Sequence, residues 1–228
     1  MFSDGDADGD GVEELVEIFF DGRNNGPLAT ADYGALREDA AIVFEASDLI
    51  GNDLEFDGDT LTLLSVQDAV NGTVSLGPDG RVTFTADPDY SGEASFTYTV
   101  SDGRGGTDTQ IVRLTVEAVA DVPNLFVEDS FGDEDSAISL DITSALTDTD
   151  GSETLAIEIS GVPAGATLSA GSDQGGGIWL LAPGDLSGLT ITPPADSDAD
   201  FTLTVTARST EAANSDVAET VTTLDVTV

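Results

Sequence analysis

The acidic residues of this chain restrict its fold more than any other feature, because they recur in short clusters whose members repel one another. The 228 residues include 45 Asp and Glu against 6 basic residues, with no His and no Cys, and the formal net charge is -39. Like charges at adjacent positions destabilise a compact state unless a cation lies among them. Carboxylate oxygens are the ligands that calcium prefers. The sequence therefore predicts a fold that includes several Ca2+ ions.

Composition also excludes several classes of partner and activity. All 6 basic residues are Arg, so no basic face exists to meet phosphate, and nucleic acid is excluded. The longest apolar runs, such as 178–182, are far too short to span a bilayer, so no direct membrane insertion is expected. Without His, Cys or Lys, most pairs of side-chain nucleophile and base are missing. We predict that the chain is not an enzyme.

The pattern of apolar residues predicts an all-β chain. Short alternating runs of Val, Ile, Thr, Phe and Tyr are separated by clusters of Gly, Asp, Asn and Pro, and no amphipathic helix of useful length is found. Pro78-Asp79-Gly80 is a tight hairpin signal, and Asn71-Gly72 opens the strand before it. In the first half we expect strands at 28–33, 41–45, 60–66, 72–76, 81–86, 94–101 and 109–117.

The second half repeats this pattern. Its expected strands lie at 124–127, 137–142, 155–160, 166–169, 177–181, 189–192, 201–207 and 219–228. The pair 96–100 and 111–116 matches the pair 201–205 and 221–226 in sequence. Two tandem Greek-key β-sandwiches follow, since one immunoglobulin-like sandwich takes about 100 residues. Their predicted ranges are 27–118 and 119–228.

The first residues resemble the end of such a sandwich. Ser3-Asp4-Gly5, an acidic loop and the strand-like run 15–20 parallel Ser101-Asp102-Gly103 and the run 111–116. Residues 1–26 are therefore predicted to be the tail of a preceding module. A lone last strand leaves an edge that seeks a partner. Three outcomes stay open: the strand is mobile, it docks on the first sandwich, or a second copy completes it by self-association.

The first acidic loop has a specific spacing. Residues 6–17 fit the pattern D-x-D-x-D-G-x5-E, which predicts Asp6, Asp8, Asp10 and Glu17 as calcium ligands. An EF-hand also needs flanking helices, whereas 16–21 alternate as a strand does. We interpret this segment as a calcium loop without the helices. The alternative is a solvated acidic turn.

Further metal ligands are predicted in the loops of both sandwiches. Loops of alternate strands gather at the two ends of a Greek-key sandwich, so acids distant in sequence converge there. The simpler alternative is that each acid only keeps a turn soluble. The predicted ligands of the first sandwich are Glu38, Asp39, Asn52, Asp53, Asp57, Asp59, Asp102 and Asp108, with Glu55 in the same loop. Those of the second are Asp133, Glu134, Asp135, Asp148, Asp150, Glu153, Asp196, Asp198 and Asp200.

The boundary between the sandwiches falls near 117–123, where a strand runs into Asp121 and then Pro123 without a Gly/Ser linker. Domains joined so closely can share a metal, so Asp121 is a further candidate.

Trp179 could stack on a sugar, but it lies in an alternating apolar strand and is interpreted as core. Paired carboxylates could hydrolyse a glycoside, but that reaction needs one acid in an apolar cleft, and these acids cluster in turns.

The motifs of the first sandwich resemble one known family. Glu38-Asp39, the run 48–61 with Asn52-Asp53 and Asp57-Gly-Asp59, Asn71-Gly-Thr, Tyr90-Ser-Gly and the run 96–108 together resemble the bacterial cadherin-like repeat over about 27–118. The family's usual Asp-x-Asp-Gly-Asp loop has Glu55 and Phe56 here. Residues 121–228 are similar to the immunoglobulin-like modules of giant bacterial RTX adhesins, through the runs 132–136, 146–153, 161–166 and 194–201.

This resemblance implies a function. Such sandwiches are calcium-dependent parts of very long bacterial cell-surface proteins, which are exported by type I secretion and used in attachment and biofilm formation. We therefore expect an extracellular structural extender that calcium rigidifies and whose partners are the neighbouring modules of the same adhesin. The alternative is a ligand-binding module near the adhesive tip, which recognises a glycan, a protein or a second copy. The adhesion target is not indicated by these motifs.

Overall fold

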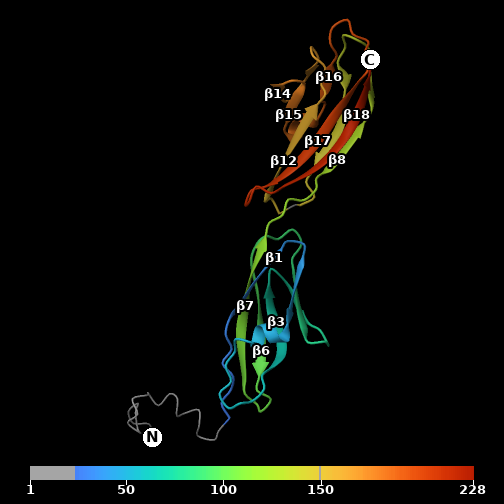
Figure 1. The fold of residues 1–228 in the computed structure, drawn as a ribbon. Coiled ribbons are helices and arrows are strands. Elements are labelled where there is room, and N and C mark those ends of the chain that lie inside the picture. The colour runs from blue at the N-terminus through green and yellow to red at the C-terminus, as the bar shows by residue number, and fades with distance from the viewer. Residues whose placement is uncertain (1–23, 149) are drawn as a thin grey trace, which may run out of the picture. The chain divides into compact units, whose positions relative to one another are not determined.

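The computed structural model describes residues 24–148 and 150–228 (Figure 1). The predicted calcium loop at 6–17 and the predicted strand at 15–20 lie outside these residues. Contacts between Cα atoms divide the chain into two compact units, Met1–Glu117 (unit 1) and Ala118–Val228 (unit 2). Each unit has its own buried core. Among the described residues, no helix combines the length and the apolar composition needed to cross a bilayer.

Unit 1 is a sandwich of two sheets. One sheet has the strand order β1-β7-β6-β3 and the other β2-β5-β4 (Figure 1). The chain therefore changes sheet between β1 and β2, before and after β3, and between β5 and β6. This is Greek-key topology. The strands are β1 Asp32–Arg37, β2 Ala41–Glu45, β3 Thr62–Val70, β4 Gly72–Leu76, β5 Arg81–Ala86, β6 Gly92–Ser101 and β7 Thr107–Glu117, and the helix α1 spans Ala46–Ile50.

Aromatic side chains fill the core of unit 1. Phe84 and Phe96 stack with ring centroids 5.9 Å apart, and Phe44 lies 6.1 Å from Phe96 at a tilted angle. The side chain of Tyr98 is completely buried beside them. In β6 the residues at 94, 96, 98 and 100 all face inward, as the alternating sequence predicts. The predicted hairpin at Pro78-Asp79-Gly80 joins β4 to β5.

The first predicted strand is wrong by several residues. Residues 28–31 contain only an isolated bridge, between Leu28 and Leu54. The strand β1 begins at Asp32 and pairs in parallel with β7. Gly34 lies within β1, and a Cβ at that position would lie 3.0 Å from Leu114 and 3.1 Å from Phe44. The glycine is there because the two sheets approach closely at β1, not because the strand ends.

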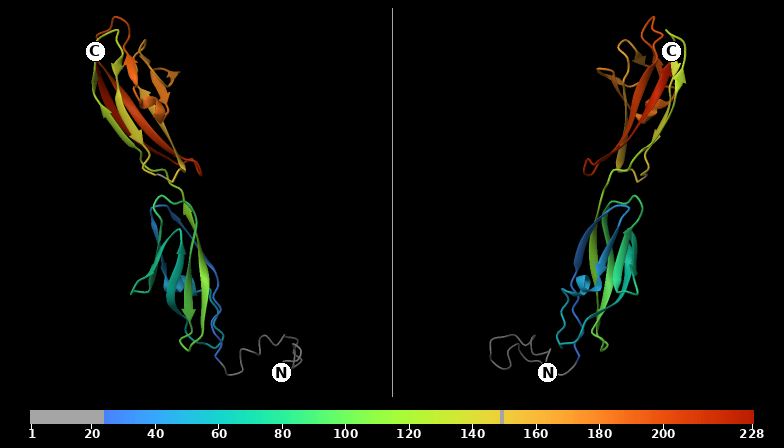
Figure 2. Two further views of the ribbon diagram at one scale, coloured as in Figure 1. Left: turned by 180° about the vertical axis from the view of Figure 1, so that it is seen from behind. Right: turned by 45° about the vertical axis from the view of Figure 1, so that its right-hand side comes forward.

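Unit 2 is also a sandwich, with a larger main sheet. Its strand order is β14-β15-β12-β17-β18-β9, and the opposing sheet has the order β10-β16-β13, while β8 and β11 form a separate pair. Several of these strands are labelled in Figure 1, and Figure 2 shows the ribbon from two further sides. The strands are β8 Asn124–Glu128, β9 Ser130–Phe131, β10 Ile138–Ser139, β11 Asp141–Ala145, β12 Glu153–Ser160, β13 Thr167–Leu168, β14 Ser172–Gly175, β15 Ile178–Leu181, β16 Thr190–Thr192, β17 Phe201–Glu211 and β18 Val217–Thr227, with a 3-10 helix at Pro183–Leu186.

Branched aliphatic side chains fill the core of unit 2. Ile157, Ile159 and Ile191 are completely buried, and Trp179 packs partly buried against this core. The strand β14 was not predicted from the sequence, because all of its residues are exposed and it therefore lacks the alternation of apolar and polar residues. The predicted fold class, two tandem all-β sandwiches, is confirmed.

Candidate metal sites

Three segments of unit 1 meet at one end of its sandwich, and each brings acidic side chains. The segment 24–32 lies against the long loop 51–61 through the Leu28–Leu54 bridge. It also reaches the β6–β7 loop, because the side-chain amide of Asn24 donates to Asp102 at 2.7 Å and the backbone N–H of Ala29 donates to Asp108 at 2.8 Å. We call this region the acidic end of unit 1. It brings together Asn52, Asp53, Asp57, Asp59, Asp102 and Asp108 of the predicted ligands.

Tyr98 reaches this end from the core. Its hydroxyl lies 2.8 Å from Oδ1 of Asp53, 3.0 Å from the carbonyl of Thr30 and 3.1 Å from that of Leu49. One hydroxyl proton cannot satisfy three acceptors. Oδ2 of Asp53 and Oδ2 of Asp32 are both buried without a hydrogen-bond partner. Burial raises the pKa of Asp32, and burial followed by the Asp53 carboxylate raises that of Tyr98.

The long loop folds around its own backbone amides. Oε2 of Glu55 accepts from the N–H of Asp57 at 2.9 Å and from that of Asp59 at 2.7 Å, while Oε1 of Glu55 is buried without a partner. The Asp59 side chain is only 9% exposed; Nε of Arg104 lies 2.7 Å from its Oδ1, and its Oδ2 is buried and unpartnered. Glu55, Asp57 and Asp59 each offer one carboxylate oxygen, and these three oxygens lie within 4.8 Å of one another.

Asp102 is held by the loop that it belongs to. Its carboxylate accepts from the N–H of Arg104 at 2.7 Å and from that of Gly106 at 2.9 Å. The hydrogen bond from Arg104 holds the pKa of Asp102 below its usual value. Gly106 packs closely because a Cβ there would lie 2.1 Å from Asp102. The glycine-rich segment 103–107 is therefore a turn around a carboxylate.

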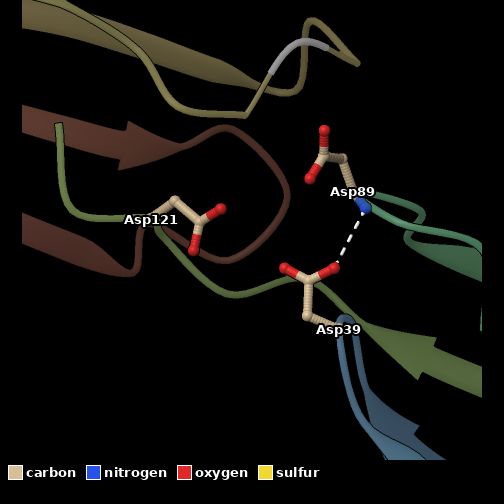
Figure 3. Close-up of side chains that lie close together, drawn as sticks. All are labelled: Asp39, Asp89 and Asp121. Carbon is tan, nitrogen blue, oxygen red and sulfur yellow. Dashed lines mark hydrogen bonds between the residues drawn. The ribbon is translucent and has the colours of Figure 1, made fainter. Parts of the chain in front are cut away.

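Glu38 and Asp39 do not join this end. They follow β1, whose first residue Asp32 lies at the acidic end, so they lie at the opposite end of the strand. The backbone N–H of Asp89 donates to Oδ1 of Asp39 at 3.2 Å, which brings a second loop of unit 1 to that place (Figure 3). Glu38 is 7% exposed.

Unit 2 contains a tighter group, formed by Asp148, Glu153 and Glu211. Their exposed fractions are 4%, 6% and 1%, and one carboxylate oxygen from each lies within 4.8 Å of the others. Glu153 and Glu211 are directly opposite in the pairing of β12 with β17. We call these residues the buried triad. Burial raises the pKa of Glu153.

The remaining predicted ligands of unit 2 are exposed or lie elsewhere. Asp150 is exposed beside the triad, and its pKa is lowered chiefly by the Ser152 side chain. The backbone N–H of Asp121 donates to Oε1 of Glu153 at 2.5 Å. At the other end of β17, the N–H of Asp196 donates to Oδ1 of Asp135 at 3.0 Å. The acids exposed around that end are Asp133, Glu134, Asp135, Asp196, Asp198 and Asp200.

Sequence reasoning missed Asp32 and Glu211. Asp32 was not considered as a ligand, because the first strand was predicted at 28–33 and residue 32 was placed inside it rather than at its beginning. Glu211 carries a clear signal, since the inward positions of β17 run 203, 205, 207, 209 and 211, with an acid at the last of them. A carboxylate in the core phase of a strand requires compensation. The predicted strand ended at 207, so this position was not considered.

The donor sets fit calcium chemically. All side-chain donors are oxygens, and the described clusters contain neither His nor Cys, the usual ligands of zinc. Calcium binds oxygens at about 2.3–2.6 Å, so two ligands on opposite sides of the ion lie up to about 5 Å apart. The separations of up to 4.8 Å within the buried triad and within the 55–59 loop are compatible with this.

Comparison with known protein families finds a match within unit 1. Residues 24–115 match the family described as bacterial Ig domain. They form an immunoglobulin-like module. The match covers the acidic end of this Ig-like module and ends before unit 2. No curated protein sequence is significantly similar to the chain.

Solved structures match this chain at low identity and low TM-score. Repeats EC22-24 of mouse cadherin-23 are 17% identical over 90% of this chain and 67% of theirs, with a TM-score of 0.49. Repeats EC1-4 of Drosophila N-cadherin are 14% identical over 90% of this chain and 49% of theirs, with a TM-score of 0.44. An endo-fucoidan hydrolase of glycoside hydrolase family 107 is 20% identical over 90% of this chain but only 28% of its own, with a TM-score of 0.27. At these values the likeness assigns no activity.

Proposed function

We propose that this chain is an extracellular structural segment of a bacterial cell-surface adhesin, whose immunoglobulin-like modules bind several Ca2+ ions and are stiffened by them. The observation that carries the proposal is the set of buried, unpartnered carboxylate oxygens at the acidic end of unit 1, on Asp32, Asp53, Glu55 and Asp59. An uncompensated buried carboxylate costs several kcal/mol. A bacterial Ig-like module with this feature is best explained by cations that complete it.

Calcium would also act as a signal of location. Where its free concentration is low, these oxygens stay uncompensated and the folded state is disfavoured. Where calcium exceeds its dissociation constant 100-fold, each site adds about 2.7 kcal/mol to the free energy of unfolding. This is a large fraction of the typical stability of one domain, about 5–15 kcal/mol. The chain would therefore stay loosely folded before export through a type I route and become rigid outside the cell.

A structural role fits the absence of catalytic chemistry in the sequence better than an enzymatic one. No His, Cys or Lys occurs in the chain, and Arg104 and backbone amides engage the carboxylates at the acidic end. The expected partners are neighbouring modules of the same parent protein. Attachment and biofilm formation would be functions of that parent, with its adhesive tip elsewhere.

Thermal unfolding with and without a chelator tests the proposal. The three Tyr residues all lie in unit 1 and the single Trp lies in unit 2, so Tyr and Trp emission report the two units separately. We expect 1 mM calcium to raise the Tyr-detected midpoint relative to EGTA. Asp53→Asn should reduce that response, whereas the exposed Asp87→Asn should not. An equal midpoint in EGTA and calcium would reject calcium as a ligand of unit 1. Sedimentation and small-angle scattering then measure whether calcium lengthens a monomer.

A further inference from the structure

We propose that unit 2 contains a calcium site of its own, formed by Asp148, Glu153 and Glu211, in which Glu211 is the closing ligand. The inference rests on the calcium dependence proposed above and extends it to residues beyond the 24–115 family match. It names an intramodular site whose ligands come from one loop and two paired strands. Calcium bound there would stabilise unit 2 directly.

The first argument is burial together with unpartnered atoms. The exposed fractions of Glu153 and Glu211 are 6% and 1%. Oε2 of each is buried without a hydrogen-bond partner. Both atoms belong to carboxylates that approach the Asp148 carboxylate within 4.8 Å. Buried carboxylates at such separations need a cation or a proton among them, because their repulsion is strong where water is excluded.

The second argument is the register of the sheet. Glu153 pairs with Glu211 across β12 and β17, and the next inward pair is Leu155 with Ser209. Like charges directly opposite in a sheet destabilise the pairing. The inward phase of both strands thus changes from apolar residues to acids at the same end. A single bound cation explains why both strands carry an acid at that register.

The third argument is the arrangement of protein donors. Each carboxylate accepts from neutral protein donors: Oε1 of Glu153 from the N–H of Asp121 at 2.5 Å, Oε1 of Glu211 from the hydroxyl of Ser152 at 2.7 Å, and Oδ1 of Asp148 from the N–H of Asp150 at 2.7 Å. The Ser152 hydroxyl also lies 3.2 Å from Oδ2 of Asp148. These bonds fix the side chains and leave Oε2 of both glutamates available. Preorganised ligands of this kind lower the entropy lost on binding.

No basic side chain of unit 2 competes for this place. Arg208 is the only basic residue in 118–228. Its Nε lies 2.6 Å from Oε1 of the exposed Glu219 on β18. In β17 it has the opposite phase to Glu211, since Ala207, Ser209 and Glu211 face inward. The compensating charge must therefore come from outside the described part of this unit.

The test compares Glu211→Gln with Glu128→Gln in the complete chain. Both changes remove one negative charge from unit 2, but Glu128 is exposed on β8. Trp179 emission follows the unfolding of unit 2 while calcium or magnesium is titrated. We expect Glu211→Gln to weaken the apparent calcium affinity about tenfold or more. In EGTA the same change should raise the midpoint, because it removes the repulsion from Glu153. Glu128→Gln should behave as wild type in both conditions.

The outcomes separate this inference from the proposed function. A calcium response of Tyr emission without one of Trp emission overturns the site in unit 2 and leaves the proposed function intact. No response of either signal overturns both. A Glu211→Gln midpoint that falls equally in EGTA and calcium shows a purely structural hydrogen bond and overturns the inference. Asp148→Asn provides a second variant if Glu211→Gln does not fold, and equilibrium dialysis should find one bound ion fewer in it than in Glu128→Gln.

Discussion

The acidic end of unit 1 and the buried triad of unit 2 present the same type of side chain in two different settings. At the acidic end, protein groups already compensate part of the charge: Arg104 contacts Asp59, and Tyr98 donates to Asp53. In the triad the donors are neutral, namely backbone amides and the Ser152 hydroxyl. If both sites bind calcium as proposed, this difference predicts that the need for a cation depends on how much of the charge the protein itself neutralises, rather than on the number of acidic residues.

The comparison assumes that the two units unfold independently, each around its own core. A substitution in one core tests this assumption, and it has the largest expected effect on stability. Phe96→Ala removes a completely buried ring that contacts both Phe84 and Phe44. We expect a loss of about 3–5 kcal/mol in the stability of unit 1. Differential scanning calorimetry measures this loss, while Trp179 emission should keep its midpoint. A matching fall of the Trp-detected midpoint would show that the units unfold together.

Removal of calcium by a chelator has the next largest expected effect on stability. It compares the calcium dependence of the two units directly. We expect EGTA to lower the Trp-detected midpoint of unit 2 more than the Tyr-detected midpoint of unit 1, since unit 1 keeps Arg104 and Tyr98 as internal donors. One calcium site at 100 times its dissociation constant contributes about 2.7 kcal/mol. For a domain of this size that corresponds to about 10 °C or more. Equal shifts in both units, measured in one melt, would contradict the distinction.

The fold followed from the sequence where alternation and turn chemistry agreed. The hairpin at Pro78-Asp79-Gly80 and the strand 81–86 were predicted with the bounds that β5 has. The same reasoning failed at β1, because Gly34 is required by close packing between sheets, and a single sequence does not show that contact. It failed again at β14, whose residues have no inward face to produce alternation.

The candidate sites were predictable in part for a related reason. Clusters such as Asp57-Gly-Asp59 are visible as local spacing, and the structure places them with Asp102 and Asp108 at one end of unit 1. Glu211 stands apart from any acidic run, so only its phase in β17 marks it. Which acids are buried, and which remain exposed as around Asp196, depends on how distant loops meet, and spacing alone does not contain that information.

A substitution at Arg104 tests how much of the charge at the acidic end of unit 1 the protein itself compensates. Arg104→Gln removes the charge beside Asp59, but the Arg side chain is 69% exposed and the pair is screened by solvent. We therefore expect a loss of about 1 kcal/mol or less in EGTA, measured by urea unfolding with Tyr emission. The loss should shrink in calcium, because the ion supplies the same compensation. Arg81→Gln, which removes an exposed pair with Glu45, serves as the control.

If the loss at Arg104→Gln were instead larger in calcium than in EGTA, Arg104 would assist the metal-bound state. The acidic end would then resemble the triad in depending on the ion for its structure. The distinction between the two units would rest on Tyr98 alone, and Tyr98→Phe would become the deciding variant.

The smallest expected effect is at the exposed pair of unit 2. Arg208→Gln removes the ion pair with Glu219, whose two side chains are 53% and 41% exposed. Such pairs contribute about 0.2–1 kcal/mol, so the midpoint of Trp emission should barely move, in EGTA or in calcium. A large fall in EGTA alone would mean that general repulsion across unit 2, rather than the buried triad, determines its need for cations. Sodium chloride would then replace calcium by screening, whereas a specific site requires the divalent ion at equal ionic strength.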